Sequence, residues 1–249
     1  MNLEPKHKPS ALKRGLEDLG YIAGEIAHDF NGLLTGILGY ASYLKTLLPE
    51  DEKKFHAANS IEISARRAAD LTRLITEYSH KEMPTHKPVK IDQVAEEAFN
   101  ELSAVAPDKV HISVEFGASA VLVLGDKDTL IRSLLHLGEN AIEAMPDGGR
   151  LTISTRPFVS DGENVEFDGF PVYRGDYVSI IVSDTGCGIP EQTRKQVFDC
   201  FFTTKPEGNG IGLAMVRRCV RKHKGFLRMD SREDGMVFEI LLPALPSTS

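Results

Sequence analysis

Apolar residues in the first third of the chain recur in alternating steps of three and four. The spacing persists from about Leu12 to Leu48, ends at Pro49, and returns from about Asp51 to Tyr78. Such spacing places apolar side chains on one face of an α-helix, and proline ends a helix. We therefore expect two long helices joined by a tight turn, forming an antiparallel hairpin. The apolar seam of the first helix comprises Ile26, Phe30, Leu33, Ile37, Tyr40, Leu44 and Leu47.

A single helical hairpin with such a seam leaves apolar surface exposed. The inward face of the second helix is expected to carry mostly small residues, namely Ala58, Ile61, Ala65, Ala68 and Ile75. Two copies of a hairpin bury their apolar faces by pairing into a four-helix bundle. We therefore predict a homodimer through residues 15–82.

The pattern changes after a proline-bearing segment, and strands then alternate with helices. We expect helices near 91–105, 127–144, 191–198 and 210–223, and strands near 110–116, 121–124, 150–155, 177–183, 225–230 and 236–242. Residues 157–176 are interpreted as a long polar loop without an assigned role. Helices gathered on one face of a sheet form an α/β sandwich, so the fold class is α+β. The predicted divisions are a lead-in over 1–14, the hairpin over 15–82, a linker over 83–90, the second domain over 91–243 and a tail over 244–249.

Composition limits the environment and partners of the chain. Its 249 residues carry a net charge of −7, which argues against nucleic acid or an anionic membrane as the main partner. Cys187, Cys200 and Cys219 have neither disulfide-like nor metal-ligand spacing, as expected for reduced thiols. The sequence contains neither an apolar run long enough for a membrane span nor a signal-peptide core. We expect a soluble, cytoplasmic chain.

His28 lies off the apolar seam of the first helix, with Asp29 beside it. Steps of four through this histidine give one row on one helix face: Gly20, Gly24, His28, Gly32 and Gly36. An interior glycine costs a helix about 1 kcal/mol relative to alanine. We infer a face stripped of side chains, to which another domain can bring a phosphate. The alternative is an ordinary surface histidine in a poor helix.

His136 and Asn140 lie one turn apart in the helix expected over 127–144, and Glu143 follows a turn later. An amide oxygen such as that of Asn140 can ligate Mg²⁺, which prefers oxygen ligands and is usually shared with substrate phosphates. The alternative is a satisfied polar pair on a helix.

A second polar stretch, Asp184-Thr185-Gly186-Cys187-Gly188, follows an apolar strand. Its glycines allow backbone to approach a planar ligand, and the carboxylate can accept a hydrogen bond from an exocyclic amine. A simple tight turn is the alternative.

Phenylalanines 198, 201 and 202 precede Thr203, Thr204 and Lys205. Most of these rings are expected in the core, and Lys205 is a candidate to bind phosphate. Gly208, Gly210 and Gly212 then open a helix, giving an amide-rich turn at a positive helix end that suits a polyphosphate.

The order of these motifs resembles the catalytic core of two-component sensor histidine kinases, in the branch whose acceptor box reads His-Asp-Phe-Asn. The resemblance covers about residues 15–243. It implies an ATP-binding domain of the gyrase and heat-shock ATPase type, with ATP and Mg²⁺ as cofactors. His28 matches the phosphoacceptor and Asn140 the Mg²⁺ ligand. The nucleotide-binding boxes correspond to Asp184, Gly186 and Gly188; to Phe198, Phe202, Thr204 and Lys205; and to Gly208, Gly210 and Gly212.

By this resemblance, His28 attacks the γ-phosphorus of Mg-ATP, Asp29 accepts the other ring proton or orients the ring, and the phosphate passes to an aspartate of a response regulator receiver domain.

Three positions depart from the family pattern. Gly32 stands where relatives carry the asparagine or threonine thought to orient water for dephosphorylation of the regulator, so we expect weak or absent phosphatase activity. His136 replaces a frequent asparagine, and the lid after Lys205 is short, with Asn209 in place of a common threonine.

Two other functions remain open from the sequence. One is a phosphotransfer scaffold with a degenerate ATP domain, against which Asn140, Asp184 and the three lid glycines count. The other is an ATPase or serine kinase of the same nucleotide fold, in which the hairpin serves only as a dimer platform. Acid lability of the phosphorylated product distinguishes phosphohistidine from phosphoserine.

Overall fold

The structure is a computed structural model that describes residues 30–49, 53–79, 87–163, 165–167, 169–205, 208, 210–232 and 234–246. The chain divides into two compact units, residues 1–82 and residues 83–249. The predicted phosphoacceptor His28 and its neighbour Asp29 lie outside the described residues, as does Asn209 of the expected lid.

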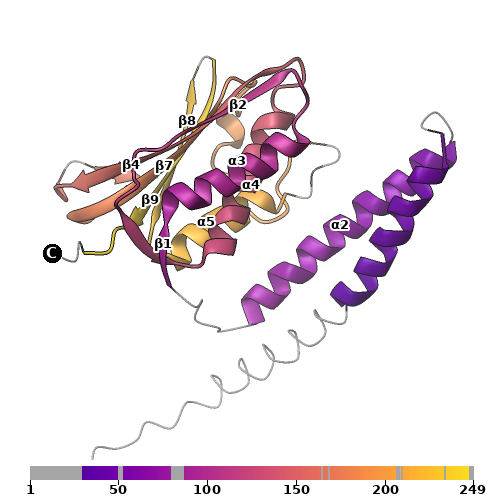
Figure 1. Ribbon diagram of the computed structural model, residues 1–249, viewed down its shortest axis with the longest axis horizontal. Coiled ribbons are helices and arrows are strands. Elements are labelled where there is room, and N and C mark those ends of the chain that lie inside the picture. The colour runs from indigo at the N-terminus through magenta and orange to yellow at the C-terminus, as the bar shows by residue number, and fades with distance from the viewer. Residues whose placement is uncertain are drawn as a thin grey trace, which may run out of the picture. The chain divides into compact units, whose positions relative to one another are not determined.

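The first unit contains two helices that lie side by side (Figure 1). Residues 30–47 are helical, and α2 spans Lys53–Ser79. Leu34 and Ala41 of the first helix are buried, as are Ala58 and Ala65 of α2. Ile61, which we expected on the inward face, is 48% exposed. It precedes Glu62 of the buried row by one residue, which turns its side chain about 100° away on a helix.

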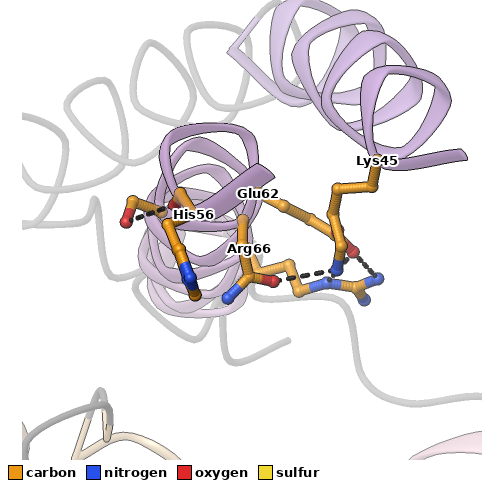
Figure 2. A network of polar contacts seen from close by, with 6 residues as sticks. Lys45, His56, Glu62 and Arg66 are labelled. Atoms are coloured by element: carbon orange, nitrogen blue, oxygen red, sulfur yellow. Dashed lines mark hydrogen bonds and ion pairs between the residues drawn. The ribbon is translucent and has the colours of Figure 1, made fainter. Parts of the chain in front are cut away.

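A polar network joins the two helices (Figure 2). The Lys45 ammonium donates to Glu62 Oε2 at 3.0 Å and to Asn59 Oδ1 at 2.8 Å. Arg66 donates to the other carboxylate oxygen, Oε1, at 2.6 Å. The hydrogen bond from Arg66, and then that from Lys45, lower the pKa of the Glu62 carboxyl below its ordinary value. The pairing offsets the cost of placing a carboxylate in the buried row between the helices.

The second unit is a five-stranded sheet with helices on one face (Figure 1). Its strands run in the order β2 (Val110–Glu115), β4 (Gly149–Ser160), β7 (Gly175–Asp184), β9 (Gly235–Pro243) and β8 (Phe226–Arg232). Only the β2–β4 pair in this sheet is parallel. The helices are α3 (Ile91–Val105), α4 (Lys127–Glu143) and α5 (Gly212–Lys222). The expected α/β sandwich is confirmed.

One core lies between the sheet and these helices. Alternate residues of β7, namely Val178, Ile180 and Val182, point into it, as a strand with one covered face requires. α4 packs closely on α3, because a Cβ on Gly138 would stand 2.3 Å from Leu102 Cδ1. Asp126 caps α4, its Oδ1 accepting the Thr129 N–H at 2.9 Å. These contacts fix the helix that carries Asn140.

Two elements were not expected at the ends of this unit. Lys87–Lys90, inside the segment predicted as a linker, form β1, which pairs antiparallel with β3 (Leu122–Gly125). In the predicted tail, Ala244 forms a bridge with Val123. A strand of four residues is too short to show a periodic pattern, and its pairing depends on a partner more than thirty residues later in the chain. The predicted linker was therefore extended to residue 90, although the second unit already begins its strand β1 at Lys87.

The prediction of a polar loop over 157–176 is wrong. β4 continues to Ser160, β7 begins at Gly175, and β5 (Glu166–Phe167) pairs with β6 (Phe170–Pro171) between them. Phe167 and Val172 are buried in a small second cluster with Tyr177 and Leu241. Single apolar residues in a polar run gave no sign of this burial.

The helix expected over 191–198 is also absent. Only Glu191–Thr193 form a single 3₁₀ turn, η1, and turns follow it. Val197 and Phe198 are buried against the main core. Two adjacent apolar residues anchor this segment by burial without requiring a regular helix.

Candidate active site

Asp184 ends β7 at the mouth of the glycine-containing turn. Its Oδ1 accepts the backbone N–H of Gly186 at 2.8 Å. Burial raises the pKa of the carboxyl, and hydrogen bonds from Gly186 and Met236 partly oppose this. A half-buried carboxylate that is fixed by its own turn provides a directed hydrogen-bond acceptor.

The turn is attached to the end of α4. Cys187 donates its backbone N–H to the carbonyl of Ala144 at 3.1 Å. A Cβ on Gly186 would stand 2.7 Å from Ala144 Cβ and 2.8 Å from its carbonyl oxygen, so only glycine allows this approach. Ala144 was not singled out from the sequence, because its role is played by its backbone.

Two further glycines, one at the start of β9 and one in the turn itself, have close neighbours. Gly235 of β9 lies against Asp184, and a Cβ there would stand 1.8 Å from the Asp184 carbonyl oxygen. Gly188 has φ +69° and faces Ser231, whose Oγ would be 3.2 Å from an added Cβ.

The polar face of α4 meets a segment more than sixty residues later in the chain. The Lys205 ammonium donates to Asn140 Oδ1 at 3.2 Å and also bonds Glu143 Oε2. On the same face, His136 Nδ1 lies 3.7 Å from Glu139 Oε2. An added Cβ on Gly212, the first residue of α5, would lie 3.6 Å from the His136 ring. The structure thus brings together four positions that the sequence had singled out: His136, Asn140, Lys205 and Gly212.

The segment before α5 is anchored by its aromatic rings. Phe198 is buried and Phe202 packs against the same core, whereas Phe201 is 59% exposed. Arg217 of α5 lies over the Phe198 ring, 5.6 Å from its centroid. The prediction that most of these rings belong to the core is consistent with this arrangement.

Local hydrogen bonds shape the turn that carries Lys205. Thr203 Oγ1 accepts the Lys205 backbone N–H at 3.1 Å, and the Lys205 carbonyl accepts the Gly208 N–H at 3.1 Å. Gly210 has φ +65°, and its carbonyl accepts the Phe201 N–H at 2.8 Å. Thr203 therefore organises this turn, and both Thr203 and the predicted ligand residue Thr204 are exposed.

The donor atoms on α4 fit a hard cation that is shared with a ligand. Within the described part of the chain, no group of three or more His, Cys, Asp or Glu side chains could hold a metal ion. Two oxygens, one from Asn140 and one from Glu143, nevertheless converge on a cation, the Lys205 ammonium. Mg²⁺ usually binds through one or two protein oxygens together with substrate phosphates and water.

Among the described helices, none is both long and apolar enough to cross a membrane.

Comparison with known proteins places this site in a family. Residues 125–246 match the histidine kinase-, DNA gyrase B- and HSP90-like ATPase family. The chain is 31% identical over 239 residues to the sensor kinase CckA of Brucella abortus. This alignment covers 94% of the chain and 25% of CckA. Other curated sensor histidine kinases are matched over about half of their length, for example 47% of ZraS from Salmonella typhi. The chain therefore spans a quarter to about half of these relatives.

Solved structures show the same relationship. The mycobacterial sensor histidine kinase MprB is 29% identical with a TM-score of 0.52, covering 65% of this chain and 99% of that one. The histidine kinase ThkA, solved in complex with the response regulator protein TrrA, shares the fold with a TM-score of 0.60 and 22% sequence identity. The match covers 96% of this chain and 66% of the ThkA chain. These matches identify residues 125–246 as an ATPase domain of the histidine kinase, gyrase and HSP90 type, in a chain that is similar to sensor histidine kinases over 94% of its length.

Proposed function

We propose that the chain phosphorylates its own His28 with Mg-ATP and passes the phosphate to an aspartate of a response regulator. The observation that carries this proposal is the meeting of Lys205 with Asn140 on α4, one turn before Ala144 and the turn that holds Asp184. The groups that we assign to the base and to the phosphates therefore lie near one end of one helix, which supports the proposal. A scaffold with a degenerate ATP domain is not favoured, because residues 125–246 match an ATPase family.

Asp184 is the group that we assign to the adenine. Its carboxylate accepts a hydrogen bond from the exocyclic amine, and Gly186 and Gly188 leave room for the planar base. The contact of Gly186 with Ala144 supports this role, because it fixes the turn against α4 and keeps the carboxylate in one orientation.

Lys205 and the amides of the glycine segment are assigned to the triphosphate. Gly208, Gly210 and Gly212 lead into α5, whose N-terminal end favours anions. Phe198 and Phe202 support this segment from the core. Asn140 Oδ1 would hold Mg²⁺, which when bound neutralises negative charge on the phosphates.

The chemical step is a phosphoryl transfer to nitrogen. The Nε2 lone pair of neutral His28 attacks the γ-phosphorus, the bond from that phosphorus to the β,γ-bridging oxygen breaks, and ADP leaves. Asp29 accepts the Nδ1 proton or holds the ring in the reactive tautomer. The receiver aspartate then attacks the phosphorus, the P–N bond breaks, and the histidine is regenerated. The complex of the related kinase ThkA with a response regulator supports this choice of partner.

The exposed seam of the first helix supports a homodimer through residues 15–82. Its members between residues 30 and 47 are all between 44% and 75% exposed, while Leu34 and Ala41 fill the contact with α2. The seam residues in question are Phe30, Leu33, Ile37, Tyr40, Leu44 and Leu47. A contiguous apolar face of this length is rarely left uncovered in a soluble protein, and a second hairpin covers it.

Incubation with ATP labelled at the γ-phosphate tests the proposal. The wild-type chain should acquire label that is lost in acid and stable in alkali, as expected of phosphohistidine. His28→Gln should lose the label and still bind a non-hydrolysable ATP analogue. His56→Gln, which changes an exposed histidine of α2 in the same hairpin, should keep it. Acid-labile label on His28→Gln, or acid-stable label on the wild type, would contradict the assignment.

A further inference from the structure

The Lys205 ammonium is held by two side-chain oxygens of α4. It donates to Asn140 Oδ1 at 3.2 Å and forms an ion pair with Glu143. Both partners remain within reach of water, because the Lys205 side chain is 40% exposed and that of Glu143 is 59% exposed. The pair is therefore neither buried nor locked, and another ion can replace either member.

The same Asn140 oxygen is the atom assigned above to Mg²⁺. An ammonium and a divalent cation repel each other when both approach one oxygen. The triphosphate and the Glu143 carboxylate are likewise two anions that require the same ammonium. Binding of Mg-ATP would therefore require an exchange, in which the lysine leaves Glu143 for phosphate and Asn140 becomes free to hold the metal.

We propose that Glu143 is a positioning residue that holds Lys205 on Asn140, and that it lowers nucleotide affinity because this pair must open before Mg-ATP binds. The inference rests on the proposed function, since it assigns a role to a residue of the same site. This role differs from metal binding in its effect on affinity. A metal ligand increases the affinity for Mg-ATP, whereas Glu143 in the proposed role decreases it.

The chain offers a matched control for Glu143. Glu139 lies beside Asn140 on the same helix and has the same side-chain exposure, 59%. It differs in its partner, because its Oε2 faces His136 Nδ1 at 3.7 Å. Glu139→Gln therefore removes the same charge near Asn140 without releasing Lys205.

Calorimetric titration of the full chain with AMPPNP and MgCl₂ tests the proposal. Glu143→Gln should bind AMPPNP about two- to fivefold more tightly than Glu139→Gln, the range expected for opening an exposed ion pair. In a Lys205→Gln background, the two glutamate variants should bind equally. Equal affinity of the two single variants would overturn the proposal, as would weaker binding by Glu143→Gln, which would make Glu143 a metal ligand.

A measurement without nucleotide separates this proposal from the proposed function. The NMR signal of the Lys205 side-chain nitrogen, assigned by its loss in Lys205→Gln, should shift in Glu143→Gln and stay in place in Glu139→Gln. A signal that stays in place in Glu143→Gln would overturn the pairing even if the chain binds ATP. If the wild type fails to bind AMPPNP, the proposed function fails, and the nitrogen signal alone decides whether Glu143 holds Lys205.

Discussion

Gly235 and Asp184 face each other across β9 and β7 so closely that a Cβ on Gly235 would stand 1.8 Å from the Asp184 carbonyl oxygen. The register pairs Asp184 with Met236, which places the glycine beside the last residue of β7. The aspartate at the start of the candidate adenine turn is thus positioned from one side by a strand that follows it by about fifty residues.

Gly235→Ala should lower both stability and nucleotide affinity. Its φ of +144° is unfavourable for alanine, and the added methyl group would collide with backbone that cannot rotate away. Gly169→Ala is the control, because Gly169 has φ +77° but no atom within 4 Å of an added Cβ. We expect urea denaturation to show a loss at least about 2 kcal/mol larger for Gly235→Ala than for Gly169→Ala. Equal losses for the two variants would mean that the positive φ alone, and not the contact with Asp184, requires glycine at position 235.

Asp184→Asn should stabilise the protein at neutral pH while weakening ATP binding. Burial raises the pKa of Asp184 above its ordinary value of 3.8, so the folded state favours the protonated carboxyl. The stability this group contributes is present below about pH 3.8 and is lost as the pH rises through the raised pKa. A neutral amide avoids that loss. Thermal melts should therefore show a variant advantage at pH 7 that shrinks at pH 4; an advantage of equal size at both would contradict this assignment.

How far the sequence predicts the fold depends on the length of the periodic signal. The helices expected near 91–105 and 127–144 are Ile91–Val105 and Lys127–Glu143, because four or five turns with an apolar face leave little freedom. β1 and the β5–β6 hairpin were missed because two to four residues carry no period, and their pairing depends on contacts elsewhere in the chain.

The candidate site was predictable where the residue type itself carries the chemistry. Asn140, Asp184 and Lys205 could be proposed because few side chains bind a cation, an amine or a phosphate. The carbonyl of Ala144 and the pairing of Glu143 with Lys205 could not, since backbone groups have no residue-specific signal and the pair spans sixty-two positions.

Glu62→Gln should destabilise the hairpin at neutral pH. Hydrogen bonds from Arg66 and Lys45 lower the pKa of Glu62 below its ordinary value of 4.5. The stability this carboxylate contributes is therefore present above about pH 4.5 and is lost as the pH falls through the lowered pKa. The amide should cost about 1 kcal/mol at pH 7. Hydrogen exchange of α2 amides should show the difference at pH 7 and less of it near pH 4; a difference that grows in acid would contradict the role of the charge.

Replacing two seam residues by glutamate should dissociate the homodimer. Leu33 and Leu44 are 67% and 44% exposed. Fully burying an exposed leucine contributes roughly 1.5–3 kcal/mol, so covering each of these partly exposed side chains with a second hairpin contributes a part of that. Sedimentation velocity should show a monomer for Leu33→Glu/Leu44→Glu. Ser42→Glu, which adds charge at an exposed position away from the seam, should remain dimeric. A wild-type monomer, or dissociation by Ser42→Glu, would remove the argument for this interface.

Gly32→Asn should introduce phosphatase activity toward the phosphorylated response regulator. Gly32 follows His28 by four residues, and nothing lies within 4 Å of an added Cβ, so an asparagine side chain can be accommodated there. Its amide would be placed to orient a water molecule for attack on the aspartyl phosphate, which the bare glycine cannot do. Gly39→Asn is the control, because its Cβ position is equally open at a different place on the helix. The measurement is phosphate release from the regulator that accepts label fastest from the phosphorylated chain. Release by the wild type as fast as by Gly32→Asn would show that dephosphorylation does not depend on a side chain at this position.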